Sequence, residues 1–100
     1  MGNKLELKRG DTWLLDASLN VNFSLSGFTP YFSLLKDFDS SLVLDASGTI
    51  DSSIAHFEIP FTTTDDISIG NYTYSVSIWS STKRFTVVQD EATIINKPKN

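Results

Sequence analysis

The stretch "GNYTYSVSIWSST", residues 70–82, carries an apolar side chain at every second position. These apolar residues are Tyr72, Tyr74, Val76 and Ile78, and the residues between them are small and polar. Successive side chains of a β-strand point to opposite faces, so this spacing predicts a strand with one dry face and one wet face. The dry face needs a second apolar surface to cover it.

The same alternation recurs along most of the chain, and no segment keeps the three- and four-residue spacing of a helix. Short strands separated by turn signals at roughly 8 to 12 residues are typical of an all-β sandwich. The strands expected from this period are residues 4–9, 11–23, 31–38, 42–46, 54–59, 70–79 and 84–96.

We expect these strands to form a single domain over residues 1–100, with a short polar tail at residues 97–100. No linker, internal repeat or second domain is visible. The dry face that begins with Tyr72 should lie about 10 Å from an opposing sheet. The residues expected on that opposing sheet are Trp13, Leu15, Leu19 and Phe57.

Two connections have a predicted local structure. The segment "SGTIDSS", residues 47–53, is expected to be a turn in which Gly48 supplies a positive φ. After Pro60 ends its strand, a single helical turn is expected to begin near Thr63, with Ile67 or Ile69 beneath it.

The final strand is expected to contain a β-bulge. Phe85 and Val87 alternate on one face, but Ala92 and Ile94 fall out of phase with them. An extra residue in one strand restores such a phase. The segment "QDE", residues 89–91, is therefore the predicted position of the bulge.

Composition excludes several classes of protein. The formal charge is −4, and only Lys4, Lys8 and Arg9 cluster, which is too few for a nucleic-acid surface. The absence of cysteine excludes disulfides and thiolate metal sites. No signal peptide and no run of about 20 apolar residues is present, so we expect a soluble protein made in the cytoplasm without export or a membrane partner.

No catalytic constellation is recognisable. His56 is the single histidine and alternates with the apolar residues of its strand, which favours a surface position over a role as a general base. A hydrolase centred on His56 is one functional alternative to consider, beside two non-enzymatic ones. No nucleophile elbow and no phosphate-binding loop accompanies it. We therefore predict that the protein is not an enzyme.

Acidic pairs occur at residues 37 and 39, 65 and 66, and 90 and 91. Carboxylates on adjoining loops can bind calcium, but Asp is also common in turns, and none of these pairs fits an EF-hand loop. We predict no metal and no cofactor. The segments that begin at Asn22 and Asn71 fit the glycosylation sequon, which without export predicts no modification.

Three residues are candidate interaction residues. Trp79 falls on the wet face of its strand beside a turn, where it either forms a contact hot spot or covers an edge. Tyr31 and Leu35 share the face of residues 31–38 opposite to Phe32 and Leu34. Because the strands at residues 31–38 and 86–95 carry few charges, we also expect edge pairing with another chain.

Four segments then resemble a known family, namely "LKRGDTWLLDASL", "LSGFTPYFSLLKD", "GTIDSSIAHFEIPFTTTDDISIGNYTYSVSI" and "EATII". Together they are similar to small Ig-like β-sandwich proteins of phage structural gene clusters and to the N-terminal domain of phage baseplate upper proteins. The family pattern T-x-x-I-x-x-G-x-Y-x-Y-x-V is matched by Thr64, Ile67, Gly70, Tyr72, Tyr74 and Val76.

This resemblance implies an Ig-like antiparallel β-sandwich of seven to eight short strands. It also implies a non-enzymatic structural or adaptor component of a phage virion, in the tail, baseplate, neck or head. Its partners would be other virion structural proteins, contacted by multiple symmetric copies, and it brings no catalytic residues. The alternative is a carbohydrate- or protein-binding module of a bacterial surface system that uses Trp79 and the neighbouring loops.

Overall fold

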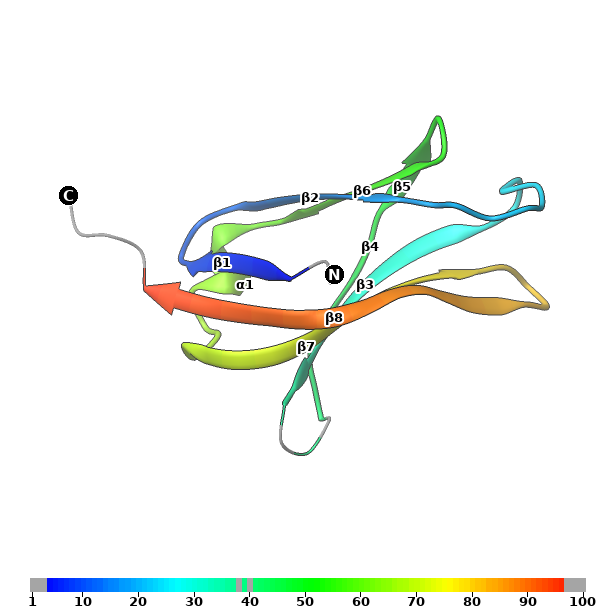
Figure 1. Cartoon of the computed structure of the whole chain (residues 1–100). Helices are drawn as coiled ribbons and strands as arrows, with labels where there is room; N and C mark the ends of the chain where they lie inside the picture. The colour runs from blue at the N-terminus through cyan, green and yellow to red at the C-terminus, as the bar shows by residue number, and fades with distance from the viewer. Residues whose placement is uncertain (1–3, 38, 40, 97–100) are drawn as a thin grey trace.

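The computed structural model describes residues 4–37, 39 and 41–96, and the polar tail predicted at residues 97–100 lies outside them. The described residues form two sheets that face each other (Figure 1). One sheet has the strand order β1-β8-β7-β3-β4 and the other has the order β2-β6-β5. The elements are β1 Leu5–Arg9, β2 Trp13–Ser18, β3 Thr29–Lys36, β4 Leu42–Ser47, β5 Thr49–Asp51, β6 Ile54–Ile59, α1 Phe61–Thr64, β7 Gly70–Trp79 and β8 Arg84–Asn96.

This strand order is that of an Ig-like sandwich. Strands β2, β6 and β5 take the places of strands B, E and D of an Ig domain, and β3, β4, β7 and β8 take those of C, C′, F and G. All neighbours pair antiparallel except β1 and β8, which pair in parallel. The predicted all-β, Ig-like sandwich is confirmed.

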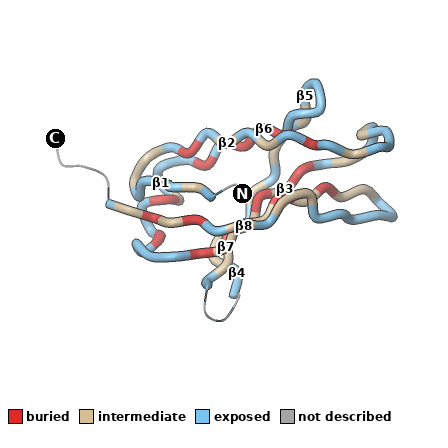
Figure 2. Tube along the Cα trace, in the orientation of Figure 1, coloured by how far each residue is buried: buried red, intermediate tan, exposed pale blue. Residues whose placement is uncertain are grey.

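The core lies between the sheets, as the alternation of the opening stretch predicts. The inward row of β7 is buried, and opposite it Trp13 of β2, Phe57 of β6 and Leu19, which directly follows β2, are buried (Figure 2). Phe32 packs at ring-centroid distances of 5.9 Å against both Tyr74 and Phe57. Aromatic rings therefore occupy the centre, where antibody domains have a disulfide and a tryptophan.

Gly48 has a role different from the predicted one. Its φ is not positive, and it is the single residue between β4 in the larger sheet and β5 in the smaller sheet. A Cβ at this position would overlap the carbonyl oxygen of His56 and the ring of Phe57. The positive φ values belong to Ser52 and Ser53, at 52° and 65°, which form the two-residue turn between β5 and β6.

Helix α1 begins at Phe61, two residues earlier than predicted. The extended Pro60 precedes it, and its carbonyl accepts hydrogen bonds from the amides of Thr63 and Thr64. Ile67 is the isoleucine buried after this helix, whereas Ile69 is exposed. Within the described residues, no helix has the length and apolar character needed to cross a membrane.

The bulge in β8 lies at Val87, so its predicted position at residues 89–91 is wrong. Val76 pairs with Val88, but the next residue of β7, Ser77, pairs with Thr86. The phase of the inward row therefore changes at Val87. The alternation of apolar residues in the sequence does not reveal the bulge at Val87, because the charged residue Asp90 occupies the inward position opposite Tyr74.

Candidate interaction surface

The face of the larger sheet that points away from the core is the candidate site, and we call it the outer face. Its members alternate with the buried residues of β3 and β7, and the pairing of the strands sets which of them are neighbours. They are Tyr31, Ser33, Leu35, Leu42, Asp45, Ser47, Thr73, Ser75, Ser77, Trp79, Arg84, Thr86, Gln89 and Glu91.

Three side chains stack at one end of the outer face. The rings of Tyr31 and Trp79 lie with their centroids 4.5 Å apart at an interplanar angle of 41°. The guanidinium carbon of Arg84 lies 4.1 Å from the centroid of the Trp79 ring. Such a cation–π contact at an exposed site contributes about 0.5–1 kcal/mol. Trp79, for which the sequence left open a contact hot spot or an edge cover, is half-buried within this stack.

A shallow hollow of about 330 Å³ connects this stack to the opposite side of the outer face. Trp79 and Arg84 line one end, Leu35 and Leu42 line the other, and the serines of β3 and β7 lie between them. The structure therefore brings together all three predicted interaction residues, because Tyr31 packs on Trp79 and Leu35 shares its hollow.

Leu42 and Arg84 belong to the surface but were missed from the sequence. Arg84 is paired with Trp79 across the β7–β8 hairpin, a relationship that follows from the length of the turn. Leu42 turns outward because the β3–β4 register shifts between Leu34 and Leu35, so that Leu35 pairs with Leu42. Leu42 is 59% exposed, which is high for a leucine within a strand.

The centre of the outer face carries no charge. Ser33, Ser75, Ser77 and Thr86 are neutral, whereas the charged side chains lie at the edges of the sheet. At one edge the ammonium of Lys4 lies 3.5 Å from a carboxylate oxygen of Glu91. A neutral centre with aromatic residues and a charged rim is the composition of protein–protein interfaces.

A row of three polar residues crosses the exposed face of the smaller sheet. By register, His56 lies between Asp16 on β2 and Thr49 on β5. His56 Nδ1 lies 2.7 Å from Asp16 Oδ1, which orients the imidazole. Thr49 and His56, both of which are described, make no side-chain hydrogen bond with each other, so the row lacks the nucleophile–base contact of a catalytic triad.

The acidic pairs do not come together. Across residues 4–37, 39 and 41–96, no group of three or more His, Asp or Glu side chains is placed to hold a metal ion. Two hydrogen bonds from Ser41, from its backbone amide and its hydroxyl, hold the pKa of the Asp39 carboxyl below its usual value. The Asp39 carboxylate is therefore used to bond Ser41 within the connection between β3 and β4.

The outer face is thus the place where the predicted interaction residues meet, and its chemistry suits another protein surface. Comparison with models of known protein families gave no match, and neither did comparison with curated proteins.

Proposed function

We propose that the protein is a non-enzymatic adaptor of a phage particle that docks onto a neighbouring virion protein through the outer face. The observation that carries this proposal is the stack of Tyr31, Trp79 and Arg84 at one end of a hollow whose centre is lined by uncharged serines. Tryptophan, tyrosine and arginine are the residue types most enriched among binding hot spots. Charged residues are depleted from the centre of interfaces, as they are here.

The virion context rests on the resemblance of the four sequence segments to Ig-like phage structural proteins. The matched residues Tyr72, Tyr74 and Val76 form the buried row of β7, so they support the shared sandwich. In a particle, a small domain with a flat docking face would be present in several symmetric copies, and each copy would use the same face.

A carbohydrate- or protein-binding module of a bacterial surface system is the alternative for the same surface, and the geometry of the hollow bears on its carbohydrate-binding form. Sugars stack on open aromatic rings, and of the two aromatic residues that line the hollow, Phe85 and Trp79, Trp79 has the larger ring. The guanidinium of Arg84 lies over this ring, at the position that a sugar would occupy. The geometry therefore favours a protein partner.

The test is quantitative mass spectrometry of particles purified on a density gradient from the culture that makes the protein. We expect the chain to remain with the particles after a high-salt wash, at a fixed ratio to the other structural proteins. Its absence from washed particles would refute the virion assignment. Recovery at the bacterial surface instead would favour the alternative module.

A further inference from the structure

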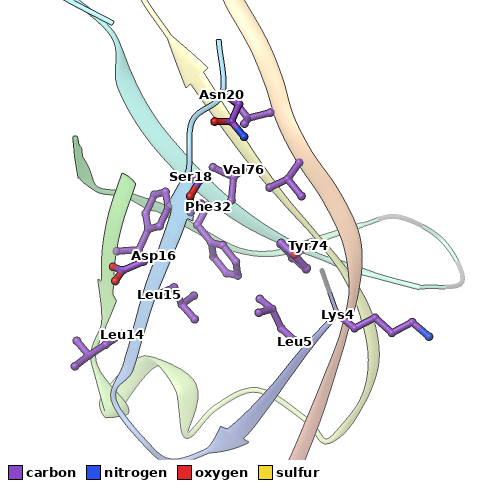
Figure 3. A pocket seen from close by; sticks show the side chains of 14 residues that line it. Lys4, Leu5, Leu14, Leu15, Asp16, Ser18, Asn20, Phe32, Tyr74 and Val76 are labelled. Carbon is purple, nitrogen blue, oxygen red and sulfur yellow. The ribbon is translucent and has the colours of Figure 1, made fainter. Parts of the chain in front are cut away.

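A second cavity opens between the two sheets, lined on one side by β2 and on the other by Val87 and Val88 of β8. It has a volume of about 690 Å³, and Leu5, Leu15, Phe32 and Tyr74 lie around its interior (Figure 3). The cavity is open because β1 is short. β1 pairs with residues 92–96 of β8, so the preceding part of β8 has no strand on that side among the described residues.

The backbone of β2 forms one wall of this cavity, which we call the β2 groove. The amide of Leu19 donates a hydrogen bond of 2.9 Å to the carbonyl of Ser53, which continues the β2–β6 register. In an antiparallel pair, alternate residues bond to the partner strand. Leu15 and Ala17 therefore bond to β6. The N–H and C=O groups of Leu14, Asp16 and Ser18 point away from β6, towards the groove.

The four edge strands of the sandwich differ in how they are protected against pairing. β5 has three residues, β4 has a register shift, and β1 carries Lys8 and Arg9. Short length, irregularity and lysine are the usual ways in which proteins block an edge. β2 is a regular strand of six residues whose single charged side chain is Asp16. Among these four described strands, β2 is therefore the edge most open to pairing.

We propose that the β2 groove binds an extended segment of a partner protein, which pairs with β2 as an added strand. Its alternate apolar side chains would enter the groove and cover Leu15, Phe32 and Tyr74. This inference goes beyond the proposed function, since it concerns a surface separate from the outer face. Backbone pairing supplies affinity in such complexes, and the buried side chains supply specificity.

The N–H and C=O groups of Leu14, Asp16 and Ser18, which we call the free backbone row, favour a peptide as the ligand of the groove. From Leu14 to Ser18 this row extends for about 13 Å, and only another strand carries donors and acceptors at the same spacing. A lipid or small apolar molecule would fill the groove but leave this row unpaired. A second folded copy would offer its own β2 edge but no alternate apolar side chains for the groove, because the inward side chains of its strands are packed in its own core.

The test uses a peptide of eight alternating valine and threonine residues, flanked by one lysine at each end. Its N-terminus is acetylated and its C-terminus is amidated. Amide exchange is measured by NMR with and without the peptide. We expect the amides of Leu14, Asp16 and Ser18 to exchange about tenfold more slowly at saturating peptide, because they gain hydrogen bonds. The amides of Leu15 and Ala17, already bonded to β6, serve as the internal reference.

Two methylated peptides separate strand pairing from simple filling of the cavity. One is N-methylated at every valine and the other at every threonine. Because alternate amides of an added strand face β2, one of these peptides should bind and the other should not. Equal binding of both would refute the proposal. Protection that appears without peptide and increases with protein concentration would also refute it, in favour of a second copy.

A matched pair of variants tests the edge itself. Leu14→Pro removes an amide that points into the groove and leaves the β2–β6 bonds in place, whereas Leu14→Thr keeps that amide. Both variants should remain folded by circular dichroism, and only Leu14→Pro should weaken peptide binding, by about tenfold. Unchanged binding to a folded Leu14→Pro variant would contradict the inference. Trp79→Ala should leave peptide binding unchanged, so the two proposals fail independently.

Discussion

The hydroxyl of Tyr72 donates a hydrogen bond of 2.6 Å to the backbone carbonyl of Ser68. Tyr72 lies near the start of β7, and Ser68 lies four residues earlier in the loop that follows α1. This is the tyrosine corner of Ig-like sandwiches, in which a tyrosine of strand F bonds back to the preceding backbone. The hydrogen bond fixes the loop that follows α1 to the start of β7. This loop lies on the connection from β6 in the smaller sheet to β7 in the larger sheet.

Tyr72→Phe removes this bond without changing the shape of the side chain. We expect a loss of about 1–1.5 kcal/mol in the free energy of unfolding, measured by urea denaturation. Tyr31→Phe is the matched control, because the Tyr31 hydroxyl makes no hydrogen bond to any residue that the structure describes, and its effect should stay within about 0.5 kcal/mol. Equal losses in the two variants would contradict the role of the corner.

Thr64 joins α1 to the turn between β1 and β2. Its side chain is fully buried, and its hydroxyl donates to the carbonyl of Asp11 at 2.7 Å and accepts from the amide of Gly10 at 3.2 Å. Thr64→Val leaves both backbone groups without this partner, which should lower the free energy of unfolding by about 1–3 kcal/mol. Thr62→Val, on the exposed side of α1, is the control and should have little effect. An unchanged free energy of unfolding in Thr64→Val would show that Thr64 does not couple α1 to the turn between β1 and β2.

Gly48→Ala tests whether the residue that connects β4 in the larger sheet to β5 in the smaller sheet must lack a Cβ. The added Cβ overlaps the backbone of His56 and the ring of Phe57, so we expect a destabilisation of at least about 3 kcal/mol in thermal or urea unfolding. Gly27→Ala is the comparison, since Gly27 has a φ of +83° but open space around it, and its cost should be about 1–2 kcal/mol. The assignment of Gly48 fails if Gly48→Ala is the milder change.

Much of the fold was predictable because one face of each long strand is buried. The alternation in β7 and β6 identified buried residues such as Tyr74 and Phe57 directly, whereas in β3 the apolar Tyr31 and Leu35 on the face opposite Phe32 left the assignment ambiguous. The local features were harder, because they depend on contacts between strands. Gly48 is required by the backbone of a neighbouring strand, and the bulge at Val87 is visible only in the pairing with β7.

The candidate site was predictable in its members but not in its geometry. The wet-face positions of Tyr31, Leu35 and Trp79 follow from the period of two within each strand. Their proximity depends on the register between strands, which no single strand specifies. The stacking of Arg84 on Trp79 and the outward turn of Leu42 depend on the β7–β8 hairpin and the β3–β4 shift.

Tyr74 should make the protein less stable at alkaline pH. Burial, and to a smaller extent the carboxylate of Asp90, raise the pKa of Tyr74 above its ordinary value of 10.0. The folded state then holds the phenolic proton more tightly than the unfolded state does. This contribution to stability is complete below about pH 10 and is lost as the pH rises through the folded-state pKa.

Tyr74→Phe removes this titration. The difference in the free energy of unfolding between wild type and Tyr74→Phe should be constant below about pH 9 and should shift against the wild type above about pH 10. Urea unfolding at a series of pH values measures it. A difference that remains constant throughout the alkaline range would contradict the raised pKa.

Hydroxyl-radical footprinting of assembled particles tests the proposed docking most directly. It compares the oxidation of Trp79 and Tyr31 in the purified protein with that in the particle, and Phe61, which is 57% exposed on α1, serves as the reference. If the outer face is an interface, oxidation of Trp79 and Tyr31 should fall about tenfold in the particle relative to Phe61, because hot-spot residues are fully desolvated. Equal oxidation of Trp79 and Tyr31 in the free and assembled states would contradict the account.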